Sequence, residues 1–483
     1  MYLGIDLGTS GVKTIAMSRT GEILASKTVE LTVSRIKPLW SEQSPADWWK
    51  ATCETIKSLG QQVDLSNVKA IGLSGQMHGA TLLGKEGDVL RPAILWNDGR
   101  CEEECKELEL KVPNSRDITG NIMMPGFTAP KLKWVANYEP ETFSKIDKVL
   151  LPKDYLRFKM TGDFASDMSD SAGTCWLDVN TRDWSDVLLE ATGLSRDNMP
   201  TLYEGSEVTG VLSADVANEL GLPQVPVIAG GGDNAAGAVG VGITEPGQAM
   251  LSLGTSGVYF AVSDGFISNP KSALHSFCHA LPNTWHTMSV ILSAASCLKW
   301  VANLTGFEDV GEMISDVEKQ ADKSSQVVFL PYLSGERTPH NDPNAKGVFF
   351  GMTHSTTRLE LAQAVLEGVG FAFADGFDAL HVTKMIPEEV SLIGGGARSE
   401  YWRQMLADIV GLPLVYREGG DVGPALGAAR LAILGVEKEA TLQQVCPVPK
   451  LVQRHTPDTE MQAYYKRKRD LYQSLYPSVK SLF

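Results

Sequence analysis

The stretch IDLGTSGV at residues 5–12 decides the fold, because it returns as LSLGTSGV at residues 251–258, about half of the 483-residue chain later. Six of the eight positions are identical. A self-match at this spacing predicts two similar domains, each opening with a glycine- and hydroxyl-rich turn between two strands. The first copy has Asp6 where the second has Ser252. We therefore expect the first turn to serve a cation and the second to receive only phosphate.

Composition and charge narrow the class of protein. The chain is 43% hydrophobic and 21% charged, with a formal net charge of −15, which is typical of a globular protein with two or three domains. The acidic charge argues against nucleic acid, whose phosphates need a basic surface. The most apolar stretch, 225–243, is broken by glycines, Asp233 and Asn234, so we expect no membrane span. Seven scattered cysteines and an N-terminus without a signal-peptide pattern predict a cytoplasmic protein.

Strands alternate with helices along the chain, which predicts α/β layers with largely covered sheets. We expect the seam between the two halves at 240–247, where glycine, threonine and proline cluster. The expected strands are 2–6, 12–17, 23–28, 68–74, 93–95, 226–229, 249–253, 258–262 and 390–393, and the expected helices are 45–59, 358–374 and 400–410.

Three glycine-rich turns follow predicted strands, at residues 8–11, 254–257 and 394–396. Such turns present backbone N–H groups to anions, but a hairpin also needs glycine for its own geometry. None of the three fits the P-loop or the G-x-G-x-x-G pattern. The duplication favours phosphate, because two matched hydroxyl-rich hairpins can hold a polyphosphate from both sides. The hydroxyls of the first turn are Thr9 and Ser10.

Two aspartates, Asp6 and Asp233, stand at the ends of predicted strands beside glycines. Open α/β sheets bind ligands at this edge, and a buried acid there needs a cation or a proton donor. Asp6 suits Mg²⁺, held through water, and Asp233 suits a general base that accepts a hydroxyl proton. Each aspartate could instead only cap a loop. Lys13 either neutralises phosphate or is a solvated strand residue.

Residues suited to a small hydroxylated ligand gather in the first half. A sugar site needs an apolar surface for C–H groups and hydrogen-bonding side chains for hydroxyls. Met77 and Trp96 can supply the apolar surface. The hydrogen-bonding candidates are His78, Asp98, Arg100 and Asn234. The alternative interpretation is that the tryptophan belongs to the core and that the aspartate–arginine pair is a local ion pair holding its loop.

A set of motifs runs through both halves. It comprises IDLGTSGVK (5–13), SGQMHG (74–79), WNDGR (96–100), TAPKLKW (128–134), GGGDNAAGAVG (230–240), LSLGTSG (251–257), PYLSGERTPH (331–340), GVFFGMT and LAQAVLEG (within 347–368) and IGGGARS (393–399). Over essentially its whole length the chain resembles the FGGY family of carbohydrate kinases. It departs from the first signature of that family at Tyr138, where a polar residue is usual, and this affects only the end of a helix.

The resemblance implies an α/β fold of two actin-like domains, each with a ribonuclease-H-type core, that enclose ATP in the cleft between them. Residues 1–244 would bind the sugar, and residues 245–483 would bind ATP. Asp233 would be the catalytic base and Asp6 the acid linked to Mg²⁺. The implied sugar-binding residues are Met77, His78, Asp233 and Asn234, alongside the candidates Trp96, Asp98 and Arg100. The implied ATP-binding residues are Thr9, Ser10, Lys13, Gly254, Thr255, Ser256, Gly394, Gly395 and Gly396.

We expect MgATP to phosphorylate the C5 hydroxyl of the ketopentose D-xylulose, giving D-xylulose 5-phosphate. The substrate prediction depends on QMHG, because glycerol kinases carry an Arg-Glu pair at this strand end. Ribulose, gluconate or glycerol remain alternative substrates. A more distant alternative is an ATPase of the actin or chaperone type, in which QMHG, WNDGR and GGGDN would have no role. The two-domain layout predicts hinge closure around 240–247, and the resemblance suggests a homodimer.

Overall fold

The computed structural model describes residues 1–320, 324–419 and 423–483. In these ranges the chain forms two seven-stranded mixed sheets and five two-stranded ladders. The first sheet has the order β13-β14-β5-β1-β2-β3, with β15 paired to β5. Its strands are β1 (Tyr2–Leu7), β2 (Gly11–Met17), β3 (Ile23–Glu30), β5 (Ile71–Gly75), β13 (Val208–Val211), β14 (Pro226–Ile228) and β15 (Gly231–Gly232).

The second sheet repeats the central strand arrangement of the first. Its order is β18-β19-β17-β16-β22-β23-β24. In both sheets the opening strand pairs antiparallel with the next strand of its hairpin and parallel with a strand that arrives later in the chain. The strands are β16 (Ala249–Leu253), β17 (Gly257–Ser263), β18 (His275–Cys278), β19 (Trp285–Ile291), β22 (Val390–Ile393), β23 (Leu414–Arg417) and β24 (Leu451–His455). The two-domain α/β fold with duplicated cores, expected from the repeated octapeptide, is confirmed.

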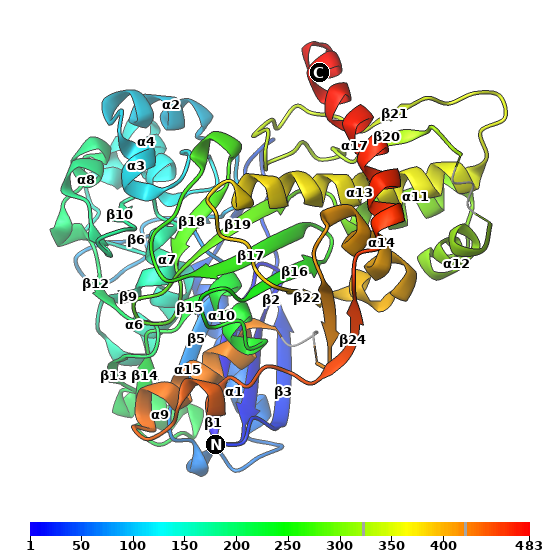
Figure 1. The fold of residues 1–483 in the computed structure, drawn as a ribbon. Coiled ribbons are helices and arrows are strands. Elements are labelled where there is room, and N and C mark those ends of the chain that lie inside the picture. Colours follow the sequence, from blue (N-terminus) through cyan, green and yellow to red (C-terminus); the bar gives the residue numbers. More distant parts are fainter. Residues whose placement is uncertain (321–323, 420–422) are drawn as a thin grey trace.

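Helices cover both faces of the sheets, and smaller elements extend the first half. Figure 1 shows α2, α3 and α4 grouped at one corner of this half. The helices before the second sheet are α1 (Pro45–Leu59), α2 (Glu102–Lys111), α3 (Ser115–Thr119), α4 (Thr128–Tyr138), α5 (Pro140–Phe143), α6 (Pro152–Thr161), α7 (Met168–Ala172), α8 (Asp186–Thr192), α9 (Ala214–Leu220) and α10 (Asp233–Gly240). Those after its first strand are α11 (Ala295–Thr305), α12 (Val310–Gln320), α13 (Arg358–His381), α14 (Glu400–Val410), α15 (Pro424–Val436), α16 (Leu442–Val445) and α17 (Thr459–Val479).

The two-stranded ladders lie outside the main sheets. They are β4 (Glu42–Gln43) with β7 (Ala93–Ile94), β6 (Thr81–Leu83) with β8 (Lys148–Leu150), β9 (Ala165–Asp167) with β12 (Thr201–Tyr203), β10 (Leu177–Asp178) with β11 (Asp183–Trp184), and β20 (Val328–Leu330) with β21 (Val348–Phe350). Among the described helices, none combines the length and the apolar character needed to cross a membrane.

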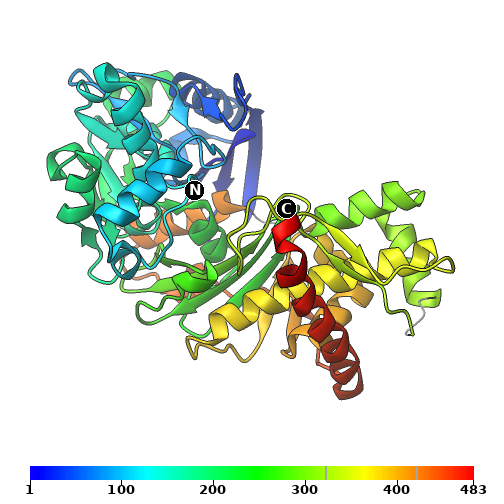
Figure 2. The same cartoon turned by 90° about the horizontal axis from the view of Figure 1, so that it is seen from above.

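Helix α15 crosses from the second half to the first. It packs against β1, β5 and α10, and in Figures 1 and 2 it is the orange helix beside the blue strands. The approach is close enough to require glycine on the strands, because a Cβ at Gly4 would lie 1.9 Å from the carbonyl oxygen of Ala425 and one at Gly72 would lie 1.8 Å from that of Ala428. The two halves are therefore joined by helix packing as well as by the chain, and the division after residue 244 stays a prediction.

Local sequence signals account for most element boundaries. Helix α1 spans the predicted 45–59, with Pro45 in its first turn and Gly60 after its last. Helix α13 begins where predicted, behind a capping box of Thr357 and Glu360. It continues to His381 rather than ending at 374, because its second half is also buried in the core of the second domain.

Candidate functional site

Asp233 begins helix α10 directly after the short strand β15. Its Oδ1 accepts hydrogen bonds from the backbone N–H of Asn234 at 2.8 Å and from the side-chain Nδ2 of Asn234 at 3.0 Å. Desolvation raises the pKa of Asp233 to about 6, against the opposing effect of these two bonds. The carboxylate is thus held by its neighbour and has a pKa close to the range in which a general base works at neutral pH.

Asp6 lies near the end of β1, at the same sheet edge as Asp233. The register aligns Asp6 with Ser74 of β5, and β5 in turn aligns with the glycines that precede Asp233. Burial raises the pKa of Asp6 to about 7, and the negative charge of Asp233 adds to this rise. Lys13 stands opposite Asp6 in the antiparallel hairpin. Among the described residues, the Oδ1 atom of Asp6 is buried without a hydrogen-bond partner.

His78 follows β5 in a left-handed backbone conformation, with φ of 71°. Its Nδ1 lies 2.6 Å from the carbonyl oxygen of Gly173, so Nδ1 donates and Nε2 remains available as an acceptor. Thr128 Oγ1 and Lys131 Nζ donate to the carbonyl oxygen of His78 at 3.1 and 3.2 Å. Burial lowers the pKa of His78 to about 3, so the ring is neutral.

Met77 connects this histidine to the catalytic candidate. A Cβ on Gly232 would lie 2.8 Å from Met77 Cγ, so the Met77 side chain packs directly on the backbone before Asp233. Met77 also packs close to Gly173, where a Cβ would lie 2.9 Å from Met77 Cε. The structure therefore brings Met77, His78 and Asp233 together, from segments that are far apart in sequence.

Trp96 lies on the surface of the site rather than in the core. It is 41% exposed, and its indole Nε1 donates to Thr9 Oγ1 at 2.9 Å. The Thr9 hydroxyl in turn donates to Gln76 Oε1 at 2.9 Å. These hydrogen bonds thus connect three parts of the site: the first glycine-rich turn, the QMHG segment and Trp96. The interpretation of Trp96 as a core residue is wrong.

Asp98 and Arg100 form the local ion pair that the sequence also predicted, which is compatible with a role in the sugar site. Arg100 Nε and Nη2 donate to the two oxygens of Asp98 at 2.9 and 2.6 Å. Arg100 also lies 2.8 Å from a carboxylate oxygen of Glu42, and its guanidinium stacks 3.6 Å above the ring of Trp40. The Arg100 side chain is only 2% exposed. This geometry holds the loop behind Trp96, and the expected contact of Asp98 and Arg100 with substrate hydroxyls stays a prediction.

The second turn presents exposed hydroxyls at Thr255 and Ser256. The carbonyl oxygen of Thr255 accepts the N–H of Ala294 at 2.9 Å and the hydroxyl of Ser296 at 2.8 Å. Helix α11 begins at Ala295, so the turn lies at the N-terminal end of this helix. A cavity of about 500 Å³ lies beside it, lined by Thr255, Ala295, Ser296, Lys299, Trp300 and Asn303.

Nothing in the sequence marked the α11 residues of this cavity, because a helix with Ser296, Lys299 and Asn303 on one face is typical of an ordinary solvated helix.

The third glycine-rich turn lies nearby in the same sheet. Gly394 follows β22, which pairs with β16 in parallel. It adopts φ of 88°, and a Cβ there would lie 3.0 Å from the carbonyl oxygen of Leu253. Gly394, Gly395 and Gly396 therefore run alongside the Gly254 turn.

A second cavity, of about 470 Å³, lies between the halves of the chain. Trp96 and Asp98 line it from the first half, and Glu336 and Arg337 line it from the second. The Oε1 atom of Glu336 accepts the backbone N–H of Leu292 at 3.0 Å, and burial raises the pKa of Glu336 to about 8. Both residues belong to the motif PYLSGERTPH. That motif carried the family resemblance, but neither residue was predicted to face a ligand.

Comparison with known proteins agrees with this architecture. Residues 1–240 match the N-terminal domain of the FGGY family of carbohydrate kinases, and residues 249–436 match its C-terminal domain. The chain belongs to the FGGY family of carbohydrate kinases. A carbohydrate kinase transfers a phosphoryl group from ATP to a sugar, so the enzyme class predicted from the sequence is confirmed.

This FGGY kinase has relatives of high identity. It is 65% identical to the xylulose kinase of Escherichia coli over 477 residues, which cover 99% of this chain and 98% of that protein. It is 61% identical to the xylulose kinase of Klebsiella pneumoniae over 482 residues, with full coverage of both chains. The crystal structure of a xyloylose kinase from Brucella ovis superposes with a TM-score of 0.95 at 47% identity, again over the whole of both chains.

Proposed function

We propose that this FGGY kinase transfers the γ-phosphoryl group of ATP to the C5 hydroxyl of D-xylulose, giving D-xylulose 5-phosphate and ADP. The observation that carries this proposal is the packing of Met77 on Gly232, which sets the QMHG segment against the residue before Asp233. The similarity to two xylulose kinases at 65% and 61% identity supports the choice of sugar.

Asp233 is the proposed general base. Its carboxylate would accept the proton of the attacking hydroxyl as that oxygen bonds to the γ-phosphorus and the bond to the β,γ-bridging oxygen breaks. A pKa of about 6 keeps Asp233 ionised at neutral pH, yet basic enough to take a proton. General-base action is typically worth about 10²–10⁴-fold in rate. Positioning of the two reactants contributes more, because phosphoryl transfer passes through a loose transition state.

Asp6 is the residue proposed to hold Mg²⁺. Its buried oxygen has no partner among the described residues, and its raised pKa indicates that the ionised form needs a compensating cation. Mg²⁺ binds in kinase sites through one or two carboxylates together with water and substrate phosphates, so one aspartate at this edge is sufficient. When bound, the ion would neutralise charge on the transferring phosphates. Lys13, opposite Asp6, would lie within reach of the same phosphates.

The other proposed contacts with ATP and the sugar come from the turns at 8–11 and 254–257 and from the QMHG segment. Thr9 and Ser10 would meet the phosphates from the first half, and Thr255 and Ser256 from the second. The nucleoside would continue toward the cavity beside α11, where Lys299 lies, and along the glycines at 394–396. In the sugar site, neutral His78 would use Nε2 as an acceptor for a hydroxyl, and Met77 and Trp96 would cover the carbon chain.

Sugar choice and assembly are part of the same proposal. Ribulose, gluconate and glycerol remain the alternative substrates, because the fold alone does not distinguish them. All seven cysteines are free and buried, which agrees with the prediction of a reducing, cytoplasmic environment. The homodimer stays a prediction, and the ATPase of the actin or chaperone type is not supported by the family assignment.

A coupled ADP-release assay with a panel of sugars tests the proposal. D-Xylulose should give the highest kcat/KM, ahead of D-ribulose, L-ribulose, gluconate and glycerol. The variant Asp233→Ala should lose about 10²–10⁴-fold in kcat while its affinity for ATP stays nearly unchanged. Turnover by Asp233→Ala at the wild-type rate would show that Asp233 is not the base, and faster turnover of another sugar would replace D-xylulose as the substrate.

A further inference from the structure

A buried ionic cluster lies under the sugar site, centred on Lys153 at the start of α6. The Lys153 side chain is 0% exposed. Its Nζ lies 2.6 Å from an oxygen of Asp154, 2.7 Å from one of Asp167 and 3.1 Å from one of Asp170. None of these four residues has a role in the proposed chemistry. Three carboxylates around one ammonium, all removed from water, form an arrangement that is costly to bury.

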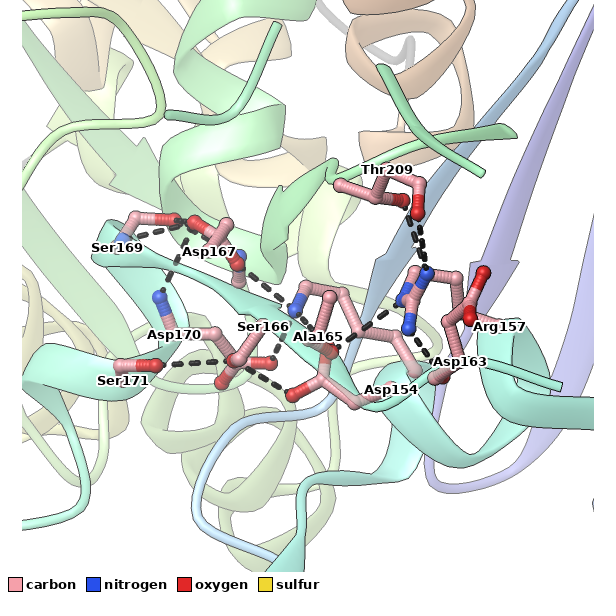
Figure 3. Close-up of polar contacts among 12 residues, drawn as sticks. Asp154, Arg157, Asp163, Ala165, Ser166, Asp167, Ser169, Asp170, Ser171 and Thr209 are labelled. Atoms are coloured by element: carbon pink, nitrogen blue, oxygen red, sulfur yellow. Dashed lines mark hydrogen bonds and ion pairs between the residues drawn. The ribbon is translucent and has the colours of Figure 1, made fainter. Parts of the chain in front are cut away.

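The cluster is connected to the backbone before Asp233 through Ser169. Figure 3 shows Ser169 beside Asp167. The backbone N–H of Ser169 donates to Asp167 Oδ2 at 2.7 Å, and the Ser169 hydroxyl donates to the same oxygen. The hydroxyl oxygen of Ser169 accepts the backbone N–H of Gly232 at 3.1 Å. An unbroken chain of contacts therefore runs from Lys153 through Asp167 and Ser169 to Gly232.

The same short helix, α7, also reaches the sugar-binding histidine. Gly173 follows the last residue of α7 and donates its N–H to the carbonyl oxygen of Asp170 at 3.0 Å. The carbonyl oxygen of Gly173 accepts from His78 Nδ1 at 2.6 Å. A Cβ at Gly173 would lie 2.5 Å from the His78 ring, so no side chain fits between them. One helix, fixed by the Lys153 cluster, thus holds the residue before Asp233 and the ring of His78.

Stability alone does not account for this arrangement. Burial and the neighbouring carboxylates raise the pKa of Asp170 well above its ordinary value, which indicates that the cluster contains more acid than one lysine can compensate. An apolar filling of the same volume is often as stable as a buried ion pair. A cluster of directional, charge-assisted contacts does, however, fix the orientation of what it holds. The Ser169 hydroxyl connects this cluster to the turn before Asp233.

We infer that Ser169, anchored by Asp167 and Lys153, is a positioning residue that fixes the Gly232 backbone and through it the carboxylate of Asp233. The inference rests on the proposed role of Asp233 as the base. A loss of this hydroxyl would leave the Gly232 N–H unpaired and let the turn before α10 relax. A displacement of about 1 Å between reacting groups can cost about a hundredfold in rate. We therefore expect the loss of the Ser169 hydroxyl to lower kcat rather than the affinity for the nucleotide.

The test compares Ser169→Ala with the matched control Ser171→Ala. Both serines are fully buried on α7 and belong to the same network, but the Ser171 hydroxyl donates to Ser166 Oγ at 2.9 Å and does not contact Gly232. We expect Ser169→Ala to lower kcat by roughly 10- to 100-fold, with KM for ATP within about twofold of wild type. Ser171→Ala should keep kcat near the wild-type value. The melting temperatures of the two variants should fall by similar amounts, and Ser169→Cys, which restores a weak donor and acceptor, should recover part of kcat.

Equal kcat values for Ser169→Ala and Ser171→Ala would overturn the inference, as would a loss that appears only in KM. The result can be read separately from the choice of sugar. If the wild-type protein does not phosphorylate D-xylulose, the same comparison is made with the sugar of the panel that it phosphorylates fastest. In that case the substrate proposal fails, while the ratio between the two alanine variants still decides the role of Ser169.

Discussion

Replacing Asp6 by asparagine should make the protein more stable and less active, and the gain in stability should depend on pH. Burial and the charge of Asp233 raise the pKa of Asp6 from 3.8 to about 7. The folded state therefore binds a proton that the unfolded chain has already released between about pH 4 and pH 7. Stability from this group is present below pH 4 and is lost as the pH rises through 7. Asparagine has no such cost at any pH.

The magnitude follows from the shift of about three pKa units. Each unit corresponds to about 1.4 kcal/mol, so ionised Asp6 costs about 4 kcal/mol of folding free energy above pH 7, when no metal or nucleotide is bound. At pH 4.5 the cost is about 1 kcal/mol by the same relation. For a domain of this size, 1 kcal/mol shifts the melting temperature by about 2–4 °C. The Asp6→Asn variant should therefore melt on the order of 10 °C higher than wild type at pH 8 and only slightly higher at pH 4.5.

Scanning calorimetry in buffer with a chelator, at pH 4.5 and pH 8, measures this difference. Because the protein has two domains, the comparison uses the transition that Asp6→Asn shifts rather than a single unfolding free energy. Asp264→Asn, at an exposed position after β17, is the control and should shift neither transition measurably. A gain of the same size at both pH values would refute the reasoning from burial and charge. The gain in stability with a loss of kcat would identify Asp6 as a residue kept for function.

Three further expectations concern the base, the nucleotide and the buried histidines. The kcat/KM for the sugar should fall about tenfold per unit below pH 6, because Asp233 with a pKa of about 6 becomes protonated; a flat profile down to pH 5 would exclude it as the base. Lys299→Ala should raise KM for ATP by about tenfold with little change in kcat, which initial-rate kinetics would show, and an unchanged KM would remove the cavity beside Thr255 from the nucleotide site. Burial lowers the pKa of His286 well below its ordinary value, so this histidine contributes stability above pH 6.5 that is lost as the pH falls. His286→Phe, which retains stacking on Phe260, should gain melting temperature relative to wild type at pH 5 but not at pH 8.

Much of the fold could be predicted from the sequence because helix and strand boundaries depend on local signals. The predicted helices 45–59 and 400–410 and the strands 249–253 and 390–393 agree with the structure in both of their ends. Helix α15 makes a contact that the sequence did not predict. Its sequence position belongs to the second half, yet it packs on the first sheet. In the sequence this contact is marked by glycines such as Gly4 and Gly72, and glycine also occurs in strands at bulges and tight bends.

In the candidate site, too, the sequence did not predict every contact between side chains that are far apart in the chain. Met77, His78 and Asp233 were predicted as neighbours and lie together, because each follows a strand that ends at the same edge. Asp98 and Arg100 were predicted as substrate contacts. They pair with each other, and Arg100 also pairs with Glu42, since a buried arginine is stable only when its charge is matched nearby. No pattern in the sequence signalled the pairing with Glu42.

The sequence by itself determined the duplication, the α/β class, the three glycine turns and the two strand-end aspartates, because each is written in consecutive residues whose conformations are set locally. Tertiary structure alone decided that Lys299 shares a cavity with Thr255, that Trp96 is exposed beside Thr9, and that Ser169 supports the backbone of Gly232. These are contacts between segments far apart in the chain. Their existence depends on packing distances of a few ångströms, which are fixed only when the sheets and helices are assembled.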